Sequence, residues 1–255
     1  MVKKAVKHVL IAVLWLTIWE VASLCIGKEL LLPSPIRVLT RLGVLVLEAS
    51  FWSAVFRSLL SVLCGVGVAL VLGVLLGFLT ARYRVLHDIL SPLLSVIKAT
   101  PVASFIILAL VWITRSGLPA FISGLMVMPI LWSNIEEGIL HIDKELLEMA
   151  QVFRLPRTKI IGKIVIPSVL PYFAAALRTS LGLAWKAGIA AEVLATPKGT
   201  IGQSLFDAKV LLETTDLFAW TLTVILLSIV LEKAVFLLLG CILSKTHTGG
   251  DVKCM

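Results

Sequence analysis

Charged residues are scarce in this 255-residue chain, and their scarcity excludes an ordinary soluble domain. Asp, Glu, Lys and Arg make up 15% of the sequence, whereas hydrophobic residues make up 59%. Soluble domains usually contain about 25% charged and about 45–50% apolar residues. Together with a mean hydropathy of +1.06, these fractions indicate that much of the surface faces lipid rather than water.

Motifs that would assemble a catalytic site are also missing. The chain has no HExxH, GxSxG or DxxD pattern, its four histidines are scattered near the ends of apolar runs, and its four cysteines form no CxxC pair. These absences argue against a membrane-embedded enzyme and against a metal site. A GxxxxGK[ST] phosphate-binding loop is absent as well, so we expect that this chain neither hydrolyses ATP nor binds a cofactor.

The positive charge that the chain does have is not of the nucleic-acid-binding kind. The formal net charge is +8, but the basic residues lie mostly between apolar runs and form no patch interleaved with aromatic residues. Lys and Arg at these places are signals of membrane topology. We therefore expect a lipid membrane, and no nucleic acid, as the surroundings of the chain.

The apolar residues form six runs of the length that a membrane-spanning helix requires, about 20 residues. Gly and Pro within the runs do not exclude a span, because neighbouring helices can satisfy the freed backbone groups. We expect an all-α, polytopic membrane protein with about six transmembrane helices. The expected spans are residues 9–26, 59–80, 89–113, 118–135, 164–194 and 217–239.

The distribution of Lys and Arg predicts the orientation of these spans. Most of the basic residues fall on the side that holds both termini, which the positive-inside rule places in the cytoplasm. The first apolar run follows Lys3, Lys4 and Lys7 but is long and has no convincing small-residue cleavage site. We expect it to be a retained helix rather than a cleaved signal peptide.

Two connections are too long to be simple turns. Residues 28–58 contain an amphipathic stretch at 36–49, for which we expect a short helix at the outer interface. The cytoplasmic connection, residues 136–163, contains Leu146, Met149, Ala150 and Phe153 on one helical face. Pro156 should end that helix and start a second one, which gives a helix–turn–helix. From the pattern alone, a plain amphipathic connector remains an alternative.

This loop resembles the EAA loop of binding-protein-dependent ABC importer permeases. The family pattern is Glu-Ala-Ala, three residues, Gly, nine residues, Ile, one residue, Leu-Pro. The spacing fits throughout, and Glu148, Ala150, Ile164 and Pro167 match in identity. Met149 and Arg154 depart from the pattern, and arginine makes a left-handed turn at the glycine position costly. The segments LLPSPIRVL, ILSPLLSVIKATPVASFIILALVW and SLGLAWKAGIAAEVLA are similar to the nitrate, sulfonate and taurine branch.

The resemblance implies a fold like that of type I ABC importer permeases, with residues 1–255 as one permease domain, a core at about 54–240 and a coupling loop at about 136–163. It implies a bacterial inner-membrane protein that pairs with a second permease copy, an ATP-hydrolysing cytoplasmic ABC ATPase dimer and an extracytoplasmic substrate-binding protein. The ATPase contact would involve Glu148, Met149, Ala150, Phe153, Arg154 and Pro167.

Charged residues within the expected spans are candidates for the translocation path, because buried charges in a membrane usually face the bundle interior or water. The candidates are Lys98, Thr100, Pro101, Lys186 and Glu192. A cationic path would suit a small anion such as a sulfonate, taurine or nitrate, although related permeases also carry neutral pyrimidines. The structural alternative is that these charges pair with acids or reach an interface. An ion-gradient-driven secondary transporter is the alternative function.

Overall fold

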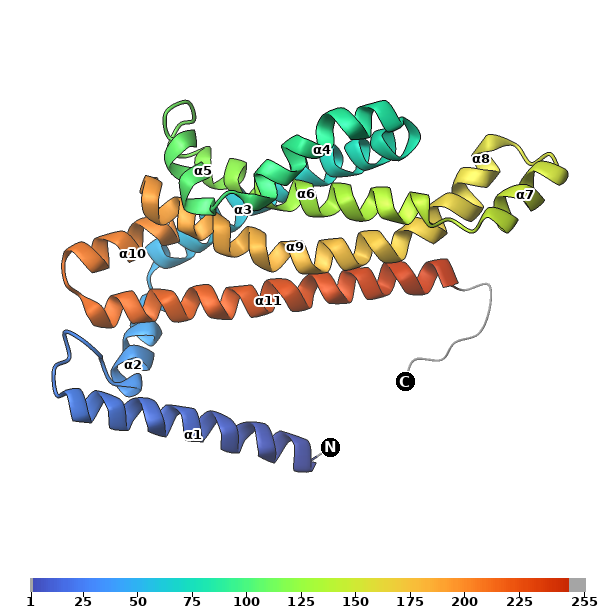
Figure 1. Ribbon diagram of the computed structural model, residues 1–255. Coiled ribbons are helices and arrows are strands. Elements are labelled where there is room, and N and C mark those ends of the chain that lie inside the picture. Colours follow the sequence, from blue (N-terminus) through green and yellow to red (C-terminus); the bar gives the residue numbers. More distant parts are fainter. Residues whose placement is uncertain (1, 248–255) are drawn as a thin grey trace.

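The computed structural model describes residues 2–247. Within this range, the side chains at positions 2–5, 8, 9, 12, 238, 239 and 241–247 are not described. Every regular element in the described part of the chain is helical, as expected from the sequence (Figure 1). The elements are α1 (Val2–Ile26), α2 (Pro35–Val46), α3 (Ala49–Arg82), α4 (Arg84–Ala99), α5 (Val102–Ala109), α6 (Leu118–Leu140), α7 (Lys144–Val152), α8 (Arg157–Ile160), the π-helix η1 (Ile161–Val165), α9 (Ile166–Ala195), α10 (Ile201–Val210) and α11 (Thr214–His247).

Four helical stretches within residues 2–247 are long and apolar enough to cross a membrane, and a fifth span is made if α4 and α5 count as one. The four are Ala49–Arg82, Leu118–Leu140, Arg157–Ala195 and Thr214–Leu237. The predicted first span coincides with α1, where Val13–Ile26 forms a shorter apolar helix. A membrane bundle of helices is therefore confirmed, whereas the count of six spans stays a prediction.

The third expected span, residues 89–113, is wrong as a single helix. α4 and α5 meet at a bend of 103°, and the chain leaves helical geometry at Thr100 and Pro101, whose ψ angles are 131° and 135°. Proline disfavours helical backbone at the residue before it and has no N–H to donate. The break therefore follows from the Thr100-Pro101 pair, and the span is either broken or re-entrant.

The outer connection is more helical than the sequence suggested. The expected interfacial helix is α2, which begins after the N-cap Ser34 with Pro35 in its first turn. α3 then begins at Ala49, ten residues before the predicted start of the second span at position 59. A further short helix, α10, was not predicted, since no apolar run marks it.

Three helices, α3, α6 and α9, form the packed centre of the molecule. α3 approaches α6 closely through glycines: a Cβ added at Gly65 would lie 2.0 Å from the Ala120 carbonyl oxygen, and one at Gly73 would lie 2.8 Å from the Leu131 Cβ. Small residues at such positions let membrane helices make close van der Waals contact. Trp132 and Trp185 fill the core, and each indole N–H donates, to Thr80 and to the Val224 carbonyl respectively.

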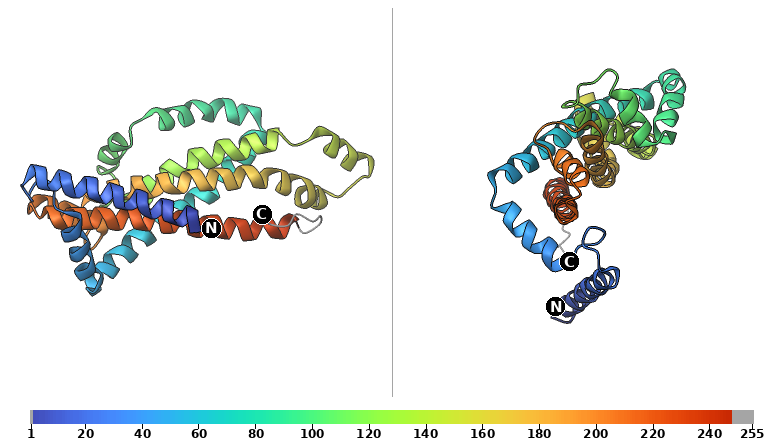
Figure 2. Two further views of the ribbon diagram at one scale, coloured as in Figure 1. Left: turned by 90° about the horizontal axis from the view of Figure 1, so that it is seen from below. Right: turned by 90° about the vertical axis from the view of Figure 1, so that its left-hand side faces the viewer.

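The two ends of the bundle are different. The α7–α8 segment projects beyond the long helices at one end, on the same side as the end of α11 (Figures 1 and 2). α10, the α1–α2 connection and the start of α11 lie at the opposite end (Figure 1). The predicted cytoplasmic loop and α10 thus lie at opposite ends of the bundle (Figure 1).

Candidate functional site

The candidate coupling loop begins with α7, which confirms the helix predicted from the apolar spacing. Asp143 is its N-cap, and the Asp143 carboxylate accepts from the Glu145 backbone N–H at 2.9 Å. An aspartate here satisfies a backbone donor and complements the helix dipole.

The turn after α7 keeps a left-handed residue although glycine is missing. Arg154 has a φ of 46°, and its N–H donates to the Gln151 carbonyl at 2.9 Å. The Leu155 N–H donates to the Ala150 carbonyl, also at 2.9 Å. This pair of hydrogen bonds is the Schellman motif that usually has glycine in the position of Arg154. The turn geometry is therefore preserved, and Arg154 takes it up at a steric cost of about 1–2 kcal/mol.

The side chains of α7 separate into an inward and an outward set. Ala150 is fully buried and packs in a cluster with Ile142 and Ile164, which Leu155 also joins. Met149 and Phe153 are 43% and 71% exposed, and Glu148 is exposed as well. Ala150 therefore fixes the loop to its own chain, whereas Glu148, Met149 and Phe153 are available to a partner.

The loop continues into the membrane without an interruption in helical structure. α8, η1 and α9 together form one helical stretch, Arg157–Ala195, of 39 residues. The π-helical turn Ile161–Val165 lies directly before Pro167, which lacks a backbone donor. A displacement of the loop would therefore be transmitted directly to α9.

Lys98 and Thr100 line a cavity of about 360 Å³ between the α4–α5 bend and helices α6 and α9. The Lys98 ammonium donates to the Ser133 hydroxyl at 2.7 Å. The Thr100 hydroxyl donates back to the Val96 carbonyl at 2.7 Å, and Pro101 lies exposed at the bend. No carboxylate of the described residues lies within 4.0 Å of the Lys98 ammonium.

Lys186 lines a second cavity, of about 650 Å³, between α9 and α11. Arg178, Glu232 and Lys233 line the same cavity, and the Arg178 guanidinium lies 4.8 Å from the centre of the Phe236 ring. Leu183 borders this cavity and the one at Lys98, so the two are neighbours. The structure thus brings Lys98 and Lys186 to adjoining hollows along one side of α9.

Glu192 lies apart from these lysines. Its side chain is fully buried, and Oε2 accepts from the Ser58 hydroxyl at 2.7 Å and from the Gly202 N–H at 3.0 Å. The Ser58 hydroxyl also accepts from the Ile201 N–H at 3.0 Å. Glu192 and Ser58 therefore fasten the start of α10 to α3 and α9.

Sequence reasoning missed one hydrogen-bond partner of these lysines and one acidic residue of the Lys186 cavity. Ser133, the hydrogen-bond partner of Lys98, carries no signal that separates it from other serines in apolar helices. Glu232 does carry such a signal in the sequence, because it is an acidic residue inside the run 217–239 that is predicted to span the membrane.

Comparisons with known proteins identify the family of the chain. Residues 69–246 match the family described as binding-protein-dependent transport system inner membrane component. The chain is 30% identical over 212 residues (78% of this chain, 75% of the relative) to the nitrate import permease protein NrtB of Synechocystis sp.. It is 26% identical over 223 residues (84% of this chain, 78% of the relative) to SsuC of Bacillus subtilis, named for transport of aliphatic sulfonates. It is 33% identical over 161 residues (62% of this chain, 57% of the relative) to the bicarbonate transport system permease protein CmpB of Synechococcus elongatus.

The match covers most of the chain and includes the coupling loop and all the helices from the second half of α3 onwards. The family is not itself catalytic, and it is a membrane component of ABC transport systems. The chain therefore belongs to the binding-protein-dependent inner-membrane permeases of ABC importers, in the branch that contains these three relatives.

Proposed function

We propose that this chain is the permease subunit of an ATP-driven importer for a small anion. It would work as a pair of identical copies, with a cytoplasmic ABC ATPase dimer that uses ATP and an extracytoplasmic binding protein that delivers the substrate. The observation that carries the proposal is the loop itself, which presents exposed side chains at one end and continues without a break into α9.

Coupling would proceed through the outward side of α7. Met149 and Phe153 offer exposed apolar surface, and exposed apolar anchors usually dominate the affinity of a protein contact. Glu148 and Arg154 would lie at the rim of that contact, where charges contribute mainly to orientation. Because α8, η1 and α9 are continuous, closure of the ATPase dimer would tilt α9 and move the lysine-lined cavities beside it. Pro167 would lie at the joint, next to the π-helical turn.

The anionic nature of the substrate is supported by two independent observations. Lys98 and Lys186 line adjoining cavities and have no carboxylate within 4.0 Å among the described residues. The three relatives are named for nitrate, aliphatic sulfonates and bicarbonate, and all three are anions. In this proposal Thr100 and Pro101 shape the path at the helix break, and Glu192 braces its outer end rather than touching the substrate.

Co-purification of the permease with a co-expressed ABC ATPase of the same importer tests the coupling. Phe153→Ala and Glu148→Lys should each weaken retention of the ATPase about tenfold or more, while the permease still inserts into the membrane. Tyr83→Ala is the matched control, since Tyr83 is an exposed aromatic residue in the turn between α3 and α4. It should leave retention unchanged.

Two results would contradict the proposal. Full retention of the ATPase by both loop variants would show that α7 is not the contact. Uptake of labelled nitrate, methanesulfonate and bicarbonate at an unchanged rate, with the phosphate-binding lysine of the ATPase replaced, would favour a gradient-driven transporter.

A further inference from the structure

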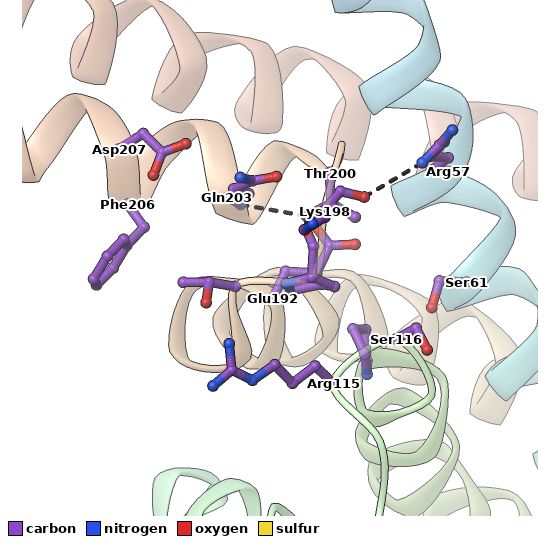
Figure 3. Close-up of a pocket in the computed structure, with 13 residues that line it drawn as sticks. Arg57, Ser61, Arg115, Ser116, Glu192, Lys198, Thr200, Gln203, Phe206 and Asp207 are labelled. Carbon is purple, nitrogen blue, oxygen red and sulfur yellow. Dashed lines mark hydrogen bonds between the residues drawn. The ribbon is translucent and has the colours of Figure 1, made fainter.

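A third cavity, of about 700 Å³, lies at the end of the bundle opposite the coupling loop. Its walls come from three parts of the chain: α3, the loop before α6, and the segment from the end of α9 to α10 (Figure 3). If α7 faces the cytoplasm, as the proposed function requires, this cavity opens to the outside. It is distinct from the two lysine-lined cavities, with which it shares no residue.

Three cations line this cavity, one from each wall: Arg57 on α3, Arg115 before α6, and Lys198 between α9 and α10 (Figure 3). Among the described residues, no carboxylate oxygen lies within 4.0 Å of any of their charged nitrogens. Arg57 donates only a long hydrogen bond, of 3.4 Å, to the Lys198 carbonyl. These cations thus line one cavity, and none of them has a carboxylate partner among the described residues.

Two carboxylates also line the cavity, and they do not cancel its positive charge. Glu192 directs Oε2 to Ser58 and Gly202, and its Oε1 is buried without a hydrogen-bond partner in the described part of the chain. Asp207 is exposed on α10 (Figure 3). The cations outnumber the two acids, and neutral hydroxyl donors such as Ser61 and Ser116 lie among them.

The wall that bears Lys198 is an ordered turn rather than a loose loop. Gly199 has a φ of 70°, and its N–H donates to the Gln203 side-chain oxygen at 2.6 Å. The Thr200 hydroxyl caps α10 by accepting from the Gln203 N–H. The Ile201 N–H donates to the Ser58 hydroxyl, and the Gly202 N–H donates to the Glu192 carboxylate. A Cβ at Gly199 would lie 3.0 Å from the Arg57 Nη1, so this turn fits closely against Arg57. The backbone at Lys198 and Gly199 is therefore held beside the Arg57 side chain.

We propose that this cavity is an outer anion-binding vestibule, which takes a small oxyanion before it enters the membrane path. A guanidinium group can donate in parallel to two oxygens of nitrate, bicarbonate or a sulfonate, and hydroxyl groups can donate to the remaining oxygens. The volume falls within the usual range for small-ligand sites, about 300–1,000 Å³. These donors line a hollow rather than a flat surface, which favours a small anion over an acidic protein surface. This inference rests on the proposed function for the direction of transport and for the choice of anions.

Direct anion binding tests the vestibule. Isothermal titration calorimetry of the purified full-length permease in lipid nanodiscs, at constant ionic strength, would measure the Kd for nitrate, methanesulfonate and bicarbonate. Arg57→Gln, Arg115→Gln and Lys198→Gln should each raise the Kd of at least one anion about tenfold, because each removes a charge-assisted hydrogen bond. Lys209→Gln is the matched control, since Lys209 is an exposed lysine on α10 outside the cavity. It should leave the Kd unchanged.

The outcomes separate this inference from the proposed function, because binding is measured without any ATPase. Equal Kd values for the three cavity variants and wild type, or no anion binding at all, would overturn the vestibule even if uptake proves to be ATP-dependent. If anion binding is unaffected and the variants instead weaken docking of the binding protein, the cavity is a protein contact and the inference is wrong. Anion binding that depends on the three cations would stand even if uptake needs no ATP.

Discussion

At the scale of single residues, three helices within residues 2–247 end in a left-handed residue that is not glycine. Arg154, Thr196 and Leu212 have φ angles of 46°, 48° and 59°. The turn at Leu212 has the same pair of hydrogen bonds as the turn at Arg154. The Leu212 N–H donates to the Lys209 carbonyl, and the Glu213 N–H donates to the Ala208 carbonyl. A side chain costs about 1–2 kcal/mol in this conformation, so each turn is held by its surroundings and not by local preference.

Arg154→Gly should therefore make the coupling loop more stable locally. Glycine removes the steric cost at φ 46°, although the greater freedom of the unfolded chain offsets about 0.5–1 kcal/mol of the gain. We expect slower amide hydrogen exchange in a peptide that covers residues 150–156, measured by mass spectrometry on the purified permease.

Arg157→Gly is the matched control, because Arg157 begins the helix α8 and has no left-handed strain. Glycine there should speed exchange in the neighbouring residues, since it lowers helix propensity by up to about 1 kcal/mol. Faster exchange at 150–156 in Arg154→Gly would contradict the account of the turn.

At the scale of elements, the length and periodicity of apolar runs predict where the helices lie. The apolar runs located α3, α6, α9 and α11, and the spacing of Leu146, Met149 and Ala150 located α7. The sequence could not predict that Ala150 turns inward, because that depends on Ile142 and Ile164 from outside the helix. The break at Thr100-Pro101 was signalled by proline, but other prolines, such as Pro129 and Pro171, lie inside unbroken helices. Only packing decides between these outcomes.

The sequence predicts the residues of the coupling loop better than the residues that line the cavities, because the loop depends on local contacts and the cavities on distant ones. The loop is local, so a motif of twenty residues, 148–167, contains both the turn at Arg154 and the passage into α9. The cavities join side chains from α4, α6, α9 and α11, and sequence distance hides such neighbours. Lys186 and Glu192 lie six residues apart in the chain, yet Lys186 lines the hollow beside α11 whereas Glu192 fastens α10.

The contact between α3 and α6 provides a test with two glycines of one helix. Gly65→Ala would place a Cβ 2.0 Å from the Ala120 carbonyl oxygen, so α6 would have to move. We expect a loss of about 1–3 kcal/mol, which is typical of overpacking, and a lower unfolding midpoint of the detergent-solubilised protein.

Gly67→Ala serves as the control, because a Cβ there meets no atom within 4 Å. It should raise stability slightly, since alanine is the better helix former by up to about 1 kcal/mol. Equal unfolding midpoints for the two variants, followed by tryptophan fluorescence during heating, would show that the helices do not pack as closely as described.

At the scale of the whole molecule, cations line three cavities that all border α9. Arg57, Arg115 and Lys198 line the cavity at the end of the bundle opposite α7, Lys98 and Lys186 line the other two, and Arg178 and Lys233 share the cavity with Lys186. The loop that would bind the ATPase lies at the far end of α9. α9 thus borders all three cavities, and its N-terminal end is continuous with the coupling loop. ATP-driven motion of α9 would therefore change the surroundings of a transported anion.

Lys98→Gln and Lys186→Gln should each slow uptake of a small anion by the complete importer in proteoliposomes. At about 8 Å and an effective dielectric constant of about 20, one positive charge stabilises an anion by about 2 kcal/mol, which corresponds to about thirtyfold in rate. Lys98→Arg and Lys186→Arg retain the charge and should keep most of the rate. Lys28→Gln, outside the cavities, should keep all of it.

The measurement is the initial rate of labelled nitrate or methanesulfonate uptake, with ATP hydrolysis followed in the same vesicles to show that coupling is intact. Unchanged uptake in both Lys→Gln variants would exclude the cationic path. A neutral substrate, such as a pyrimidine, gains nothing from a fixed positive charge, so its uptake should be insensitive to these replacements. The ratio of the Lys→Gln rate to the Lys→Arg rate therefore reports the charge of whatever the permease carries, even before the natural substrate is known.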